Sequence, residues 1–262
     1  MKHIFLLSCT AILTLGACKK DEPSLYDNTT KAPLSVEFDN ILGSSDLQLN
    51  TGIYTNAAGE NFSVTKLKYF VSNFKLTNIN GSVFTVPQDS SYFLINEGSN
   101  DDVKINVPEG EYTSITFTIG VDSLRNTMDI SKRTGVLDPA TEAADLYWGW
   151  NSGYIFFRID GTSPVVATAD HVFNYHVGGF GGYSSPTPNN LRNVTLDLSA
   201  RGTPKVKAGK STNIHLMVDL LKMLSGNTTM SFAATPMIHS AAGAIPLANN
   251  YTAMFRHDHT EN

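Results

Sequence analysis

The sequence predicts an all-β fold, a β-sandwich of the immunoglobulin-like or a related type with about 8–10 strands and one or two short helices. Short runs rich in β-branched and aromatic residues recur along the chain, and several alternate between apolar and polar positions, as residues 114–119 do. Turn-forming pairs such as Asn80-Gly81 separate these runs. Apolar spacing typical of helices is confined to small pieces.

The elements follow from this pattern in chain order. The expected strands are 34–38, 61–76, 91–95, 114–121, 154–160, 171–177, 193–198, 212–218 and 229–232. A short helix is expected at 139–145, because Asp138 suits an N-cap and Pro139 suits the first helical position. A second helix of one or two turns is expected at 219–224.

The segment 145–161 (DLYWGWNSGYIFFRIDG) contains both tryptophans of the chain within three residues. Interpreted as a strand with a period of two residues, it places Trp148 and Trp150 side by side on one face. Aromatic side chains bury roughly 150–250 Å² each, so a core strand is one interpretation. A chemical role for the indoles requires partner side chains, and the histidines are the residues that can supply them.

Three regions are expected: a lipoprotein signal peptide at 1–17, a lipidated Cys18 with a flexible tether at 18–33, and the β-sandwich domain at 34–262. A basic start precedes an apolar run, and residues 15–18 (LGAC) resemble a bacterial lipobox. Residues 19–22 (KKDE) resemble the start of lipoproteins of the Bacteroidota. We therefore expect a lipid anchor on Cys18 in the outer membrane, with the domain facing the periplasm or the cell surface.

Cysteine content and charge exclude several kinds of site. The only two cysteines are Cys9, within the signal, and Cys18, so the mature domain has no disulfide and no free thiol. A metal would have to be held by histidine, carboxylate or methionine side chains, or by an unusual ligand. The 24 acidic residues outnumber the 19 basic ones, which argues against nucleic acid as a partner. No Ser-His-Asp order and no pair of catalytic carboxylates stands out, so the sequence does not predict an enzyme.

Several blocks of the sequence point to a family when they are taken together. They are 121–126 (VDSLRN), 137–139 (LDP), 146–154 (LYWGWNSGY), 173–179 (FNYHVGG) and 249–259 (NNYTAMFRHDH). The chain resembles the MbnP-like family of bacterial copper-binding proteins, which are associated with methanobactin and related copper systems. The resemblance extends from about residue 35 to the end, and the block with both tryptophans is its most specific part.

The resemblance implies a secreted or periplasmic protein that binds one copper ion through histidines and a tryptophan oxidised to kynurenine. It also implies a partner, a di-haem peroxidase-like enzyme resembling MauG, which carries out the oxidation. An intact indole does not ligate a metal because the lone pair of its nitrogen belongs to the ring, whereas ring opening exposes an aryl amine. Imidazole and amine nitrogens favour copper. Trp148 and Trp150 are both candidates for the modification, and Trp148 is preferred.

Four histidines are the expected copper ligands. His257 and His259 flank Asp258, so in an extended segment both point to one face and form a chelating pair. His176 lies on an expected strand just before two glycines that allow a tight turn. His239 is a further candidate. A core role for His176, or a solvated tail for the C-terminal pair, is the alternative interpretation.

The remaining residues complete the hypothesis. His171 and His215 are expected to be structural, and Asp258 or Asp170 is expected to hold the second ring nitrogen of a ligating histidine. The sequence therefore predicts a non-catalytic copper-binding lipoprotein of the cell envelope that serves copper acquisition or homeostasis. The alternative is a surface β-sandwich that binds a glycan or a protein ligand through exposed aromatic side chains, without metal.

Overall fold

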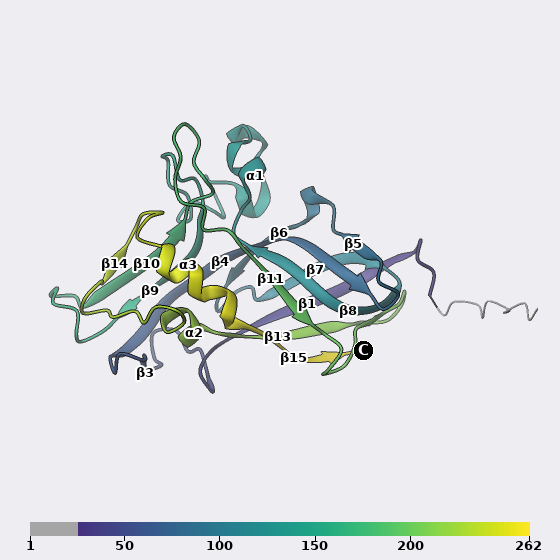
Figure 1. The fold of residues 1–262 in the computed structure, drawn as a ribbon, viewed down its shortest axis with the longest axis horizontal. Helices are drawn as coiled ribbons and strands as arrows, with labels where there is room; N and C mark the ends of the chain where they lie inside the picture. The colour runs from purple at the N-terminus through teal and green to yellow at the C-terminus, as the bar shows by residue number, and fades with distance from the viewer. Residues whose placement is uncertain (1–25) are drawn as a thin grey trace, which may run out of the picture.

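The computed structural model describes residues 26–262, so the expected signal peptide, Cys18 and the first part of the tether lie outside the described residues. Two β-sheets pack face to face, with short helices at their edges (Figure 1). The fold is therefore the all-β sandwich that the sequence predicts. Within the described residues, none of the helices has both the length and the apolar character needed to span a membrane.

The smaller sheet has five strands in the order β15-β13-β1-β2, with β7 also paired to β1. Its strands are β1 (Lys31–Leu42), β2 (Ser45–Asp46), β7 (Asp102–Pro108), β13 (Asn213–Asp219) and β15 (Phe255–Glu261). β13 runs parallel to β1 and antiparallel to β15. Leu34, Val36 and Phe38 of β1 are fully buried and alternate with more exposed residues, so one face of this sheet packs on the core.

The larger sheet has ten strands, with the central order β11-β8-β4-β9-β10-β14. These strands are β4 (Asn61–Asn78), β8 (Gly110–Ile119), β9 (Ile155–Thr162), β10 (Val172–Gly178), β11 (Arg192–Asp197) and β14 (Met237–Ile238). The short strands β3 (Tyr54–Thr55), β5 (Val83–Thr85) and β6 (Tyr92–Asn96) pair with β4, and β12 (Lys205–Val206) pairs with β8.

The main core lies between the two sheets. Phe38 of β1 contacts Phe117 of β8 and Phe255 of β15 edge-to-face, with ring centroids 5.6 and 6.2 Å apart. Tyr69 of β4 stacks on Phe157 of β9 at 5.1 Å. Burying each such side chain contributes roughly 1.5–3 kcal/mol, so aromatic packing holds the two sheets together.

A second, smaller core lies on the outer face of the larger sheet, the face that points away from β1 and β13. Tyr69 and Val71 of β4 belong to the main core, whereas Phe70 between them packs in the smaller one. The segment 121–154, which links β8 to β9, covers this face and contributes Leu146 and Trp148. Its first element is α1 (Ser123–Thr127), which projects at the top of Figure 1.

The other helical elements are short. They are α2 (Leu220–Leu224), α3 (Ile245–Asn250) and the 3-10 turns η1 (Gln88–Ser90), η2 (Ile130–Lys132), η3 (Gly135–Leu137) and η4 (Tyr251–Met254). The helix expected at 219–224 is present as α2. The helix expected at 139–145 is wrong, because this segment forms consecutive turns, with Asp138 accepting from the backbone of Ala140 and Ala143. So short a segment gains little from helix propagation.

Eight of the nine expected strands are present, and the exception is 229–232. The strands that were not predicted are β2, β3, β5, β7, β12, β14 and β15. In segment 229–232 the backbone N–H of Phe232 donates to the carboxylate of Glu60 instead of to a neighbouring strand. Met230 donates to the carbonyl of Leu224 at the end of α2. Side-chain and turn partners therefore satisfy this segment, although its residue types favour a strand.

Candidate metal centre

The two tryptophans lie in a tight turn, so the expectation that residues 145–161 form one strand is wrong for 145–154 and correct from Ile155, where β9 begins. Tyr147 and Tyr154 form an isolated bridge, and the N–H of Trp148 donates to the carbonyl of Gly153 at 2.9 Å. Gly153 has a φ of +68°, a conformation that favours glycine. The prediction that the indoles lie side by side is nevertheless confirmed, because Trp148 and Trp150 stack with centroids 5.2 Å apart and planes 17° from parallel.

The stacked indoles differ in exposure. Trp148 is 5% exposed and packs in the smaller core, whereas Trp150 is 55% exposed. Trp148 lies directly on the backbone of β10, since a Cβ added at Gly178 would come within 2.7 Å of its Cζ3 atom. Val177 belongs to the main core, so Gly178 and His176 on either side of it face outward together. Trp148 therefore covers the outward position next to His176.

His176 meets a second histidine from a distant part of the chain. The ring of His239, which follows β14, stacks on His176 with centroids 4.5 Å apart and planes 20° from parallel. The parallel pairing of β10 with β14 produces this approach. Lone pairs lie in the ring planes, so an ion shared by the two imidazoles requires one ring to tilt towards the other.

Asp160 on β9 fixes the orientation of His176. Its Oδ1 accepts from His176 Nε2 at 2.8 Å and from Asn174 at 3.0 Å, and its Oδ2 accepts from Arg158 at 2.7 Å. Burial alone would raise the pKa of Asp160, but these hydrogen bonds outweigh it and lower the pKa to about 2. The bond at Nε2 selects the His176 tautomer whose lone pair is on Nδ1.

The charge around His239 also suits a metal ligand. Burial lowers the pKa of His239, and the adjacent His176 and Arg158 lower it further, so the neutral imidazole is favoured.

We call the set Trp148, Trp150, Asp160, His176 and His239 the tryptophan corner. Asp145 lies beside it, where it accepts from Lys66 and Lys68 and pairs with Arg158 at 3.2 Å.

The C-terminal histidines do not share a face. On β13, His215 pairs with His259 and Leu216 pairs with His257, so Asp258 is an extra residue that forms a β-bulge in β15. His257 therefore faces inward opposite Leu216, is 8% exposed and contacts Thr260 Oγ1 at 2.9 Å. The bulge breaks the alternation of side chains on which the expected chelating pair was based.

Asp258 and His259 instead gather around His215, a residue expected to be only structural. Asp258 Oδ2 lies 3.0 Å from His259 Nδ1 and 3.6 Å from His215 Nδ1. One ligand atom from each of the three residues lies within 4.8 Å of the others. The hydrogen bond to Asp258 raises the pKa of His259. We call these three residues the C-terminal cluster.

The tryptophan corner and the C-terminal cluster do not converge. The corner is built on the larger sheet and the cluster on the smaller one. Figure 1 shows β10 and β14 at the left of the molecule and the C-terminus after β15 at the lower right. The structure therefore brings His176 to His239, with Trp148 over Gly178 at the next outward position of β10, and it separates this group from His257 and His259.

The other residues named from the sequence lie outside both groups. His171 has a φ of +53°, and its Nδ1 contacts the carbonyl of Val166 at 2.7 Å, which is the structural role expected for it. Asp170 lies exposed in the turn before β10, so Asp160 takes the part of the carboxylate partner instead. Asp160 was missed because only the pairing of β9 with β10 brings it beside His176.

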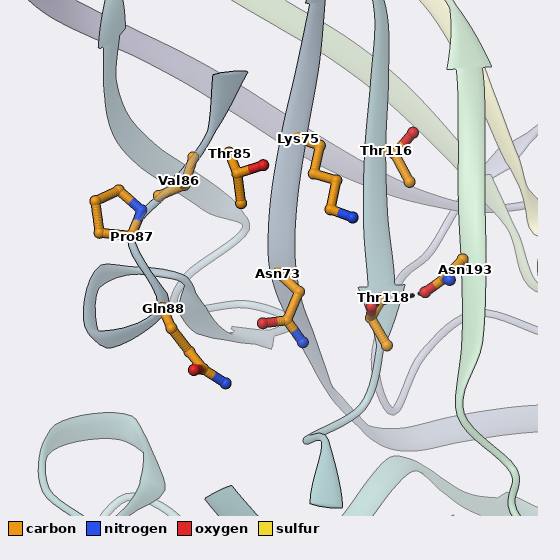
Figure 2. A pocket seen from close by; sticks show the side chains of 9 residues that line it. All are labelled: Asn73, Lys75, Thr85, Val86, Pro87, Gln88, Thr116, Thr118 and Asn193. Carbon is orange, nitrogen blue, oxygen red and sulfur yellow. Dashed lines mark hydrogen bonds between the residues drawn. The ribbon is translucent and has the colours of Figure 1, made fainter. Parts of the chain in front are cut away.

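A separate hollow of about 470 Å³ lies over the outer face of β4, β8 and β11 (Figure 2). Its lining consists of Asn73, Lys75, Thr85, Val86, Pro87, Gln88, Thr116, Thr118 and Asn193. Figure 2 shows Thr118 on β8 bonded to Asn193 on β11, at 2.8 Å. Because these residues include no histidine, carboxylate or aromatic ring, the hollow offers neither a transition-metal site nor a surface for stacking a sugar.

Comparison with known proteins gives one consistent result. A family profile described as MbnP matches residues 31–240. Among solved structures, MbnP from Methylosinus trichosporium is similar, with a TM-score of 0.54 and 16% sequence identity. The similarity covers 77% of this chain and 80% of that chain. None of the curated proteins compared matches this chain. At this identity the structural similarity shows a shared fold.

Proposed function

The chain belongs to the MbnP family, and from this premise we propose that it is a copper-binding lipoprotein of the cell envelope whose copper site is the tryptophan corner. The observation that carries the proposal is the packing of Trp148 against β10 next to His176, with His239 stacked on that histidine. The protein serves copper acquisition or homeostasis and is not an enzyme. Cys18 anchors it in the outer membrane.

The donor set of the corner fits copper. The imidazoles of His176 and His239 supply nitrogen ligands, and copper binds such ligands more tightly than the other divalent ions of its series do. Asp160 holds His176 at Nε2 and so presents Nδ1 to the ion, in the way carboxylates orient metal-bound histidines in many proteins. Copper is the cargo in this proposal, and the third donor has to come from a modified Trp148.

Oxidation of Trp148 would create that third donor. Breaking the Cδ1–Cγ bond of the indole with addition of two oxygen atoms gives N-formylkynurenine, and hydrolysis then releases the formyl carbon as formate and leaves an aryl amine. The two oxygen atoms would come from one dioxygen molecule, or from two hydrogen peroxide molecules with release of two waters, activated at the haems of a partner that resembles MauG. The exposed Trp150 stacks on the buried Trp148, so only the ring of Trp150 would separate a partner that docks on Trp150 from Trp148.

Intact mass and copper content test this proposal together. The chain is produced in a bacterial host with and without the di-haem partner, and the conversion to kynurenine should add about 4 Da only when the partner is present. Trp148→Phe should remove both the mass increase and tight copper binding. His176→Ala combined with His239→Ala should abolish copper binding and leave the mass increase in place.

Two control variants sharpen the assignment. His171→Ala changes a histidine that lies just before β10 and outside the corner, so it should bind copper as the parent does. Trp150→Phe keeps an aromatic ring over Trp148 and should retain the copper donors. Retention of both the mass increase and one tightly bound copper in Trp148→Phe would refute the corner as the site.

The exposure of Trp150 favours one alternative function, a surface β-sandwich that binds a glycan or a protein ligand without metal. An exposed indole is a common contact in such interfaces. Under this alternative the mass stays that of the unmodified chain beside the haem partner, and copper binds no more tightly than to the double histidine variant. Trp150→Ala would then abolish ligand binding.

A further inference from the structure

We propose a second metal site, separate from the tryptophan corner, in which the C-terminal cluster of His215, Asp258 and His259 binds a divalent ion of the zinc class. Two imidazoles and one carboxylate are an established ligand set for zinc, and a fourth position is left for water. The ion would link β15 to β13, because His215 lies on β13 and the other two ligands lie on β15.

The distances already approach those of a tetrahedral site. Metal–ligand bonds of about 2.0–2.1 Å in a tetrahedron place neighbouring ligand atoms about 3.3 Å apart. Asp258 Oδ2 lies 3.0 Å from His259 Nδ1 and 3.6 Å from His215 Nδ1, so one distance is slightly shorter and the other slightly longer than in an ideal tetrahedral site. All three ligand atoms fall within 4.8 Å, so a small rotation of the exposed His259 ring closes the site.

The nitrogen of His215 that faces the site makes no hydrogen bond within the described residues. His215 Nδ1 is a buried atom without a hydrogen bond among the described residues, and such atoms are rare in native proteins. The other nitrogen, Nε2, lies 3.4 Å from Asp39 Oδ2 and 3.7 Å from Glu37 Oε1. Because Nε2 is turned towards these carboxylates, Nδ1 is the nitrogen that faces Asp258 and the site.

The surrounding charges also favour a cation. Glu37 and Asp39 lie behind His215, and Glu261 Oε1 lies 3.7 Å from the outer nitrogen of His259. Arg256 at 3.0 Å and Arg201 at 3.9 Å contact the same oxygen, Oδ1, of Asp258. Because both arginines approach Oδ1, Oδ2 faces the two histidines.

The β-bulge gives the site its shape. Without the extra residue, Asp258 would alternate to the opposite face from His259, and only one of them would reach His215. The bulge places both next to the outward-facing His215. Bulges often re-aim side chains next to functional sites, and here the irregularity assembles three ligands from two strands.

Zinc titration of the full chain tests the proposal. All samples carry His239→Ala, so that zinc does not bind the tryptophan corner, and they are produced without the haem partner. The parent is compared with Asp258→Asn and His259→Ala, and His257→Gln serves as the control on the inward face of the same strand. Affinity is measured with Zn²⁺ against a fluorescent chelator, geometry from the absorption spectrum of bound Co²⁺, and stability from thermal unfolding.

The parent should bind one zinc ion, show the Co²⁺ absorption of a tetrahedral site and unfold at higher temperature when zinc is present. Asp258→Asn and His259→Ala should each weaken zinc binding by at least about tenfold, because loss of a ligand costs no less than loss of an outer partner. His257→Gln should bind as the parent does. A parent that binds no zinc, or equal affinity in all variants, would overturn the proposal. Copper binding at the tryptophan corner is tested on chains that retain His239, and its outcome does not depend on the result for zinc.

Discussion

Replacing Asp160 by asparagine tests the electrostatic basis of the tryptophan corner. The carboxylate accepts from His176, Asn174 and Arg158, whereas an amide has one acceptor oxygen and turns N–H donors towards the same groups. The pKa of Asp160 falls from 3.8 to about 2 on folding, and each pKa unit corresponds to about 1.4 kcal/mol. Asp160→Asn should therefore lower the free energy of unfolding at neutral pH by about 2 kcal/mol.

The pH dependence has a definite sign. A carboxylate whose pKa is depressed in the folded state stabilises the protein above its unfolded pKa of 3.8, and this contribution is lost as the pH falls through about 2. The difference in unfolding free energy between the parent and Asp160→Asn should be largest above pH 5 and should shrink as the pH approaches 2. Copper affinity should fall about 10–100-fold, because His176 loses its orienting partner.

Urea denaturation followed by far-ultraviolet circular dichroism between pH 2 and 7 measures the stability difference. Asp170→Asn is the matched control, because Asp170 is an exposed carboxylate of the same region and its replacement should change the midpoint much less. The reasoning is refuted if Asp160→Asn and Asp170→Asn unfold at the same urea concentration at pH 7, or if their difference persists unchanged at pH 2.

Three further variants follow from the packing, from a buried carboxylate and from the lipid anchor. Gly178→Ala should lower stability by about 1–3 kcal/mol in thermal unfolding, because the new Cβ would lie 2.7 Å from Trp148, whereas Gly149→Ala, with open space around its Cβ, should melt as the parent does. Glu60→Gln should cost about 1–3 kcal/mol in chemical denaturation, because its buried carboxylate accepts from the backbone of segment 229–233, and an unchanged midpoint would contradict this role. Cys18→Ser should move the protein from the membrane fraction to the soluble fraction, and continued membrane association would exclude Cys18 as the anchor.

The sequence predicted the features that depend on neighbouring residues. The alternation in β1, β8 and β13 is a local pattern with a period of two, and it was sufficient to predict those strands and the all-β class. The side-by-side placement of Trp148 and Trp150 was also predicted, although a turn and not the expected strand produces it. The mistake at 229–232 arose where the side chain of Glu60 replaced a regular backbone partner, and the mistake at 139–145 arose where consecutive turns replaced a helix.

The tertiary structure alone decided which histidines meet. His176 reaches His239 only because β10 pairs with β14, and His215 reaches His259 only because β13 pairs with β15. Strand pairing joins residues far apart in the chain, so no local pattern specifies it. The single extra residue in β15 then reverses the side on which His257 lies, since each added residue in a strand turns the following side chains to the other face.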